Sequence, residues 1–345
     1  MTEPFAYTSR AVRVVFGENA LSRLPQELDR LAAGRVYLVG TPGREAQLEQ
    51  LARSLGTRVA GSFTGARVHV PGEVTDRAVS GLDRAGATTV LALGGGSAIG
   101  VAKALARIRE LKIAAVPTTY SGSEMTDVWG TTSAGEKRTG RDARVAPGLV
   151  LYDPLLTLSL PPHESATSGM NAIAHAVEAL YAPDRNPIAT LFAHESIRLL
   201  SSALPAIVRE PGDADARSRA LLGAHFAGQA LQLTTMGLHH RICHVLGGLG
   251  LPHATTHAIL LPHVVAFKAP NTPEAMHIVA AALGSAGAVT GLVALEKGLG
   301  ITERLRDIGL AENQIAPTSQ AVAASFGDHG GQLEDAVRQV LQAAY

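Results

Sequence analysis

The sequence predicts an α/β domain over residues 1–157 followed by an all-α domain over residues 158–345. The length of 345 residues suits about two domains of roughly 100 to 200 residues each. Short β-rich runs alternate with helix-like segments in the first half, and these runs stop after residue 154. The second half consists of alanine- and leucine-rich segments with helical periodicity. These features predict an α/β domain followed by a helical domain.

The elements of the first half can be assigned from these runs. Helical spacing of apolar residues predicts helices over 45–55 and 74–85. Strands separated by such helices form βαβ units, which build a parallel sheet with helices on both faces. The runs expected to be strands are residues 35–39, 57–63, 68–70, 88–93, 113–116 and 149–154.

Composition excludes several classes of protein. Apolar residues make up 46% of the chain and charged residues 17%, which is too hydrophobic for a disordered chain. Lys and Arg number 30 and Asp and Glu also number 30, so no basic surface for nucleic acid is expected. The single cysteine, Cys243, and an N-terminus without a signal-peptide pattern predict a cytoplasmic protein. The apolar stretch 258–267 is too short for a membrane span, and we expect none.

A glycine-rich turn joins the fourth predicted strand to a helix-forming segment. Glycines at such a turn let the backbone approach a phosphate, and the first N–H groups of the helix donate to it. The run alone also fits a simple tight turn. The residues of the turn are Gly94, Gly95, Gly96 and Ser97.

A second polar loop follows the next strand, at the sheet edge where α/β proteins bind ligands. Two such loops in succession predict a dinucleotide site, although serines here also fit a helix cap. Residues 40–44 contain no acidic side chain for a ribose hydroxyl, and Arg44 suits a 2′-phosphate, so NADH and NADPH both remain open. Lys137 and Arg138 face either a phosphate or carboxylate, or solvent. The expected cofactor residues beyond the glycine-rich turn are Gly40, Thr41, Thr118, Thr119, Ser123 and Lys137.

Histidines are concentrated in one segment of the helical half. Six of the 13 lie between residues 239 and 263, and His240 and His244 share one helical face. Asn171, His175 and Glu178 lie at i, i+4 and i+7 of an earlier helix. We expect these residues to converge on one site. A lone histidine would more simply be a core residue.

The charge of this cluster favours proton chemistry over metal binding. Metal sites of this kind usually combine imidazoles with a carboxylate, and Asn171 is neutral. A dication would be uncompensated unless Glu178 or Glu195 turned inward. Histidine serves as an acid or base near neutral pH. We therefore predict no metal and a catalytic set of Asn171, His175, His240, His244 and His253.

Taken together, these motifs resemble the iron-containing alcohol dehydrogenase superfamily, and within it the maleylacetate reductases. The resemblance spans roughly residues 10 to 270. Members of the metal-dependent branch carry an Asp at the positions of Asn171 and Gly100. The motifs that carry it are Gly94–Ser97 with Ala102-Lys103, Pro117–Glu124, Gly169–Ala179, Leu238–Gly247 and Pro252–Ala254.

The resemblance implies a dehydroquinate synthase-like fold, a homodimer and NAD(P)H-dependent reduction of maleylacetate, a small dicarboxylate, to 3-oxoadipate. His175, His240 and His253 match the remaining ligand positions of the superfamily, and His244 matches a further active-site histidine. The stretch 246–252 is one residue shorter than expected, which leaves open whether His239 or His240 faces the site. A metal-dependent alcohol dehydrogenase and a dehydroquinate synthase-like lyase with resident NAD are the alternatives.

Overall fold

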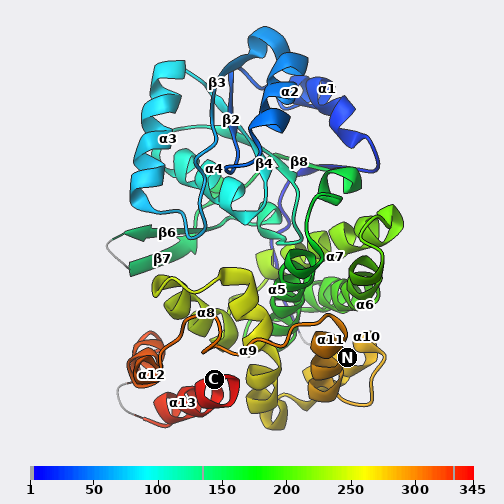
Figure 1. The fold of residues 1–345 in the computed structure, drawn as a ribbon, viewed down its shortest axis with the longest axis vertical. Coiled ribbons are helices and arrows are strands. Elements are labelled where there is room, and N and C mark those ends of the chain that lie inside the picture. Colours follow the sequence, from blue (N-terminus) through cyan, green and yellow to red (C-terminus); the bar gives the residue numbers. More distant parts are fainter. Residues whose placement is uncertain (1–3, 134–135, 329–330) are drawn as a thin grey trace. The chain divides into compact units, whose positions relative to one another are not determined.

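A computed structural model describes residues 4–133, 136–328 and 331–345. The chain divides into two compact units (Figure 1). One is Ser9–Leu160 and the other is Pro161–Tyr345 together with Met1–Thr8. The boundary expected after residue 157 lies close to this division.

The first unit is built on a six-stranded parallel sheet, with strand order β1-β8-β5-β4-β2-β3. The strands are β1 (Arg13–Phe16), β2 (Val36–Val39), β3 (Val59–Phe63), β4 (Thr89–Gly94), β5 (Lys112–Pro117) and β8 (Leu149–Tyr152), and the helices are α1 (Leu24–Arg30), α2 (Glu45–Leu55), α3 (Gly72–Ala85) and α4 (Gly96–Ile108).

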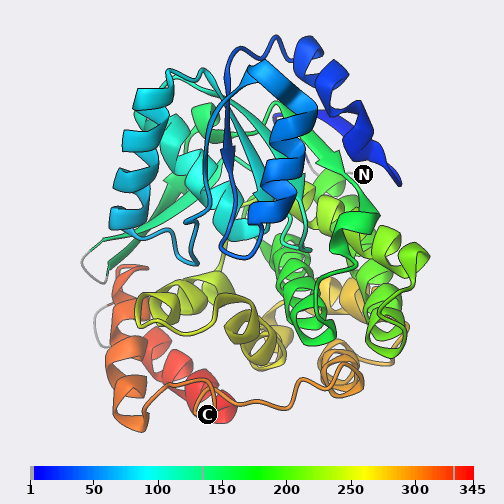
Figure 2. The same ribbon diagram turned by 45° about the horizontal axis from the view of Figure 1, so that its top comes forward.

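Helices cover both faces of this sheet (Figure 2). Leu91 and Leu93 of β4 pack in a core cluster with residues of α1 and α2. Val90 and Ala92 are also buried, and successive side chains of a strand point to opposite faces. The helix α4 packs against β4 and β5. The apolar run of β4 is thus the pattern of a strand buried on both sides.

The strand order reverses between β2 and β4. From β2 the chain moves outward to β3, then returns to the other side of β2 and continues through β4, β5 and β8. Ligands of open α/β sheets bind outside the carboxyl ends of the strands at such a switch point. The loops that follow β2, β4 and β5 therefore meet at the edge expected for a cofactor.

Residues 68–70 do not form the expected strand. His69 and Val70 have φ angles of 64° and 49°, in the left-handed region, and an extended strand excludes such angles. Instead, the loop leads into α3. A hairpin of β6 (Val128–Ser133) and β7 (Glu136–Arg141) was not predicted, and it forms a separate two-stranded sheet.

The second unit is helical. Helix α5 is buried along most of its length and packs against α6, α7 and α9. A large apolar cluster joins α8 and α9 to the last two helices. The helices are α5 (Pro162–Tyr181), α6 (Pro187–Arg209), α7 (Ala214–Gln232), α8 (Leu238–Gly248), α9 (His253–Lys268), α10 (Pro273–Leu283), α11 (Ala288–Gly298), α12 (Ile315–Ala324) and α13 (Gln332–Ala344).

One stretch of the described chain, Pro273–Gly298, has the length and mean hydropathy (2.0) of a membrane span, which the sequence reasoning did not foresee. The structure divides it into α10 and α11, each 11 residues long. An 11-residue helix is about 16 Å long, roughly half the thickness of a bilayer's hydrocarbon core. Neither helix is long enough to span a bilayer.

Candidate functional site

The structure brings together most of the residues predicted to bind a cofactor in the α/β unit. Gly40 and Thr41 follow β2, the turn Gly94–Ser97 follows β4, and Thr118 and Thr119 follow β5. The three strands are neighbours in the sheet and run parallel. Their carboxyl ends therefore place these loops side by side at the switch point.

The glycines of the turn serve three different purposes. Gly94 has a φ of 150°, a backbone conformation that other residues rarely adopt. A Cβ atom at Gly95, the N-cap of α4, would lie 2.7 Å from Thr119 Cγ2, so this glycine lets the two loops approach each other. Gly96 begins α4, and a Cβ there would meet only Ser121, at 3.8 Å. The Cβ position of Gly96 thus has few neighbours, which leaves room for an anion at the N-terminus of α4.

Polar atoms beside this turn also fit a phosphate-bearing ligand. The hydroxyl oxygen of Thr118 is buried without a hydrogen-bond partner among the residues that the structure describes. The Arg44 side chain, which we considered for a 2′-phosphate, donates to Gln47 Oε1 at 2.9 Å at the start of α2. A Cβ at Gly40 would lie 2.5 Å from Leu48 Cδ1, so packing of α2 alone accounts for that glycine.

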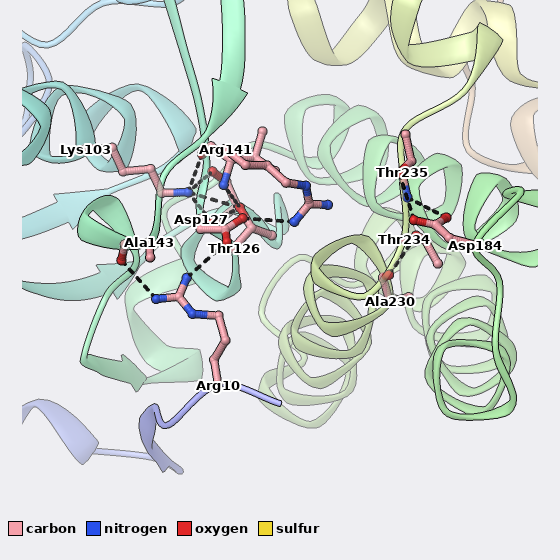
Figure 3. A network of polar contacts seen from close by, with 12 residues as sticks. Arg10, Lys103, Thr126, Asp127, Arg141, Ala143, Asp184, Ala230, Thr234 and Thr235 are labelled. Atoms are coloured by element: carbon pink, nitrogen blue, oxygen red, sulfur yellow. Dashed lines mark hydrogen bonds and ion pairs between the residues drawn. The ribbon is translucent and has the colours of Figure 1, made fainter. Parts of the chain in front are cut away.

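Lys103 of α4 holds the second loop in place (Figure 3). Its Nζ donates to the Ser123 carbonyl at 2.7 Å, the Thr126 hydroxyl at 3.1 Å and the Val128 carbonyl at 2.8 Å. Burial lowers the pKa of Lys103 to about 7, although the nearby carboxylate of Glu124 opposes that shift. Ser123, predicted to bind cofactor, is therefore engaged by Lys103. Lys137 lies on β7, paired with Thr132 of β6.

The helical unit brings the predicted histidines together. Their rings form a continuous chain of contacts from α5 through α8 to α9. His175 stacks on His240, and His257 lies at the centre. The distances between ring centroids are 4.7 Å for His175–His240, 4.8 Å for His240–His257, 4.9 Å for His239–His257, 4.4 Å for His253–His257 and 6.2 Å for His240–His244.

The structure distinguishes His239 from His240. His240 Nδ1 lies 2.6 Å from Glu178 Oε2, and His240 Nε2 is buried without a hydrogen-bond partner among the described residues. His239 Nε2 lies 3.0 Å from the carbonyl of His257, to which it donates. Both rings belong to the cluster, but only His240 pairs with a carboxylate and stacks on His175.

Glu178 is a buried carboxylate, 2% exposed, that accepts three hydrogen bonds. Besides His240, the main-chain N–H of Gly237 donates to Oε2 at 3.0 Å and that of His239 to Oε1 at 2.7 Å. Burial favours the neutral acid, but the charge and hydrogen bond of His240 outweigh it and lower the pKa of Glu178 to about 2. Glu178 is therefore ionised at neutral pH.

The buried imidazoles of His175, His239 and His257 are neutral at neutral pH. Burial lowers the pKa of His239 to about 4 and places those of His175 and His257 well below their usual range, and neighbouring imidazoles add to each shift. Neutral rings supply no positive potential for an anionic substrate, and the Arg241 guanidinium lies over the Phe326 ring, 5.3 Å from its centroid.

Two residues of this cluster were not included in the catalytic set predicted from the sequence. His257 was counted in the histidine-rich segment but was not assigned to the site, although its i+4 spacing from His253 was a usable signal. Glu178 does turn into the cluster, which we had stated as a condition for metal binding. Glu195 does not, because its carboxylate binds Arg198 on α6, at 2.5 Å and 2.7 Å.

The donor set of the cluster does not match a typical iron site. Ring nitrogens of His239, His240 and His257 lie within 4.8 Å of one another, and the buried Asn171 Oδ1 has no described hydrogen-bond partner. None of these donors carries a negative charge. Both oxygens of Glu178 already accept hydrogen bonds, whereas non-haem iron sites commonly include a carboxylate ligand. We assign no chemical step to a metal here.

Two family models and several known proteins match this chain. The model for iron-containing alcohol dehydrogenase matches residues 11–154, and that for the C-terminal part of the Fe-containing alcohol dehydrogenase family matches residues 165–345. Maleylacetate reductase 2 of Cupriavidus pinatubonensis is 52% identical over 80% of this chain and 77% of its own. Maleylacetate reductase of Pseudomonas knackmussii is 43% identical over 99% and 97%.

A crystal structure of maleylacetate reductase from a Rhizobium species is similar throughout, with a TM-score of 0.91 and 41% identity over 99% of this chain and 98% of that one. The predicted fold class is thus confirmed, and the chain is an NAD(P)H-dependent oxidoreductase. The chain belongs to the iron-containing alcohol dehydrogenase family and resembles its maleylacetate reductases.

Proposed function

We propose that this protein reduces the 2-ene bond of maleylacetate with NADH or NADPH, giving 3-oxoadipate, without a metal. The observation that carries the proposal is the buried cluster of neutral imidazoles built around a single ionised carboxylate, Glu178. This arrangement suits proton transfer. The similarity to maleylacetate reductases over nearly the whole chain supplies the substrate.

The cofactor residues in this proposal are those at the switch point. The N-terminus of α4, at Gly96 and Ser97, would hold the pyrophosphate, and the buried hydroxyl of Thr118 would donate to it. Lys103 keeps the neighbouring loop in position. When bound, the nicotinamide supplies the hydride.

The histidines stabilise the negative charge that hydride addition creates on the substrate. Hydride addition to an alkene conjugated with a ketone moves an electron pair onto the carbonyl oxygen, giving an enolate that is then protonated at the α-carbon. Because the charge is spread over the π-system, hydrogen-bond donors stabilise it without a Lewis acid. We assign proton donation to His240 and His244, which share one face of α8, and the orientation of these two rings to His175 and His253.

Asn171 separates this proposal from a metal-dependent alcohol dehydrogenase. The metal-dependent branch of the superfamily carries an Asp here, and the amide of Asn171 brings no charge to balance a dication. A side chain at Gly100, the second position of difference, would meet Val70 Cγ2 at 2.7 Å. The loop of residues 68–70 therefore fills the space that an Asp at position 100 would need.

The test is to follow nicotinamide oxidation with maleylacetate and with uncharged aldehydes of similar size. We expect maleylacetate to be the better substrate, and His240→Ala and His244→Ala each to lower kcat by roughly 10²- to 10⁴-fold, as for a lost acid–base group. The Kd for NAD(P)H should change little, because the residues proposed to hold the pyrophosphate lie at the start of α4 and after β5. Preference for aldehydes would indicate the alcohol dehydrogenase alternative. Turnover without net nicotinamide oxidation would indicate a lyase.

A further inference from the structure

Glu178 connects two parts of the helical unit that are distant in sequence. It lies on α5, and its partners Gly237, His239 and His240 lie about 60 residues later, at the start of α8. Gly237 is the N-cap of α8 and has no side-chain capping bond. Glu178 therefore supplies from another helix the acceptor that a capping side chain normally provides, at the end of the helix where a negative charge is favourable.

The same carboxylate determines which nitrogen of His240 carries the proton. An ionised carboxylate only accepts hydrogen bonds, so His240 Nδ1 must be the donor at 2.6 Å. In the neutral imidazole the other nitrogen, Nε2, then has a lone pair and no proton. Nε2 is buried and has no hydrogen-bond partner among the residues described.

We propose that Glu178 is a positioning residue for the reduction: it docks the first turn of α8 and holds His240 as the Nδ1–H tautomer, which leaves Nε2 as the nitrogen that takes up a proton from solvent and then passes it to the substrate. The catalytic part rests on the proposed function. The tautomer is a property of the free protein and can be measured without turnover.

Geometry makes Glu178 hard to replace even by its amide. Each carboxylate oxygen accepts from a main-chain N–H, Oε1 from His239 and Oε2 from Gly237. In Glu178→Gln one of these oxygens becomes an NH₂ group, which has two hydrogens and no acceptor. Either orientation of the amide therefore sets a donor against a donor. A Cβ at Gly237 would lie 2.9 Å from Glu178 Oε1, so a glycine at this position lets the carboxylate approach the start of α8.

A second carboxylate in the same region provides a matched control. Asp184 accepts from Thr235 N at 2.9 Å and from the Thr235 hydroxyl at 2.8 Å, and so holds the loop before α8 (Figure 3). Asp184→Asn makes the same change of carboxylate to amide. Its amide can still accept from the main-chain N–H, and it can donate to the hydroxyl because a hydroxyl also accepts. We expect Asp184→Asn to behave as the unchanged protein.

The experiment compares Glu178→Gln, Asp184→Asn and His240→Ala by nitrogen NMR of ¹⁵N-histidine-labelled protein and by kinetics. The His240 signals are identified as those that are absent from the spectrum of His240→Ala. In the unchanged protein they should show a protonated Nδ1 and an unprotonated Nε2. The chemical shifts of these signals should change in Glu178→Gln. We expect kcat to fall roughly 10- to 100-fold in Glu178→Gln, as for other groups that orient a histidine, with an unchanged Kd for NAD(P)H. The double variant with His240→Ala should be no slower than His240→Ala alone.

Three results would overturn the proposal: a protonated Nε2 on His240 in the unchanged protein, multiplicative losses in the double variant, or an equal loss of kcat in Asp184→Asn. If Glu178→Gln does not fold, the NMR result on the unchanged protein still decides the tautomer. If maleylacetate is not reduced, the proposed function is wrong. The NMR experiment tests the tautomer of His240 independently of that result.

Discussion

Replacing Gly96 with valine should weaken cofactor binding while leaving the fold intact. Gly96 is exposed at the first position of α4, and a Cβ there would lie 3.8 Å from Ser121, an ordinary contact. The added methyl groups would occupy the space in front of the helix N-terminus. Hydrogen bonds to a charged group contribute about 1.5–3 kcal/mol each, so losing one raises the Kd for NAD(P)H roughly 10- to 150-fold.

The assay is fluorescence titration of NADH and NADPH, with thermal unfolding as a check on the fold. Gly95→Val would be a poorer test, because its Cβ would collide with Thr119 and disturb the loop as well as the ligand. Gly298→Val is the matched control, since it lies at the end of α11 and a Cβ there meets nothing within 4 Å. Unchanged affinity in a folded Gly96→Val protein would remove the N-terminus of α4 from the cofactor site.

Two further predictions concern the metal and the buried lysine. Chelation should leave activity unchanged, and Asn171→Asp should raise the content of bound iron or zinc after dialysis, because it adds the missing charge; an activity that falls with chelation and returns with metal would contradict this. The pKa of Lys103 is 10.5 in the unfolded chain and about 7 in the folded protein. Between these two pH values the unfolded state binds more protons than the folded state. The free energy of unfolding should therefore rise with pH across that range, by up to about 5 kcal/mol. Urea unfolding of Lys103→Met should lack this rise, and parallel pH profiles would refute the assignment.

Most of the α/β unit could be predicted because its signals are local. The run that became β4 is apolar from Val90 to Leu93, and the segment 45–55 has helical periodicity that matches α2. The error at residues 68–70 had a physical cause: a Val-His-Val run favours a strand by composition, but His69 and Val70 have positive φ angles, and their carbonyls accept hydrogen bonds from Thr132 of β6. No sequence pattern reports such a constraint.

The sequence predicted most of the residues of the site but not the hydrogen bonds between them. Helical spacing within one helix placed His240 with His244 on one face, and a count of histidines indicated that they converge. The contact between Glu178 and His240 joins residues 62 positions apart, and it depends on how α5 packs near the start of α8. Single-helix periodicity carries no information on such a contact, which is why it placed Glu178 on one face with Asn171 and His175 but did not pair it with His240.

The single ionised carboxylate matches the proton requirement of the proposed reaction. Reduction of one alkene consumes one hydride and one proton. A buried group of neutral rings cannot hold a positive charge by itself, since burial and neighbouring rings both oppose it. Glu178 contacts His240 at Nδ1, so its negative charge would balance a proton that Nε2 of this ring takes up during the reaction. The cluster therefore has the capacity to store one proton, at the ring that also stacks on His175 and lies one helical turn from His244.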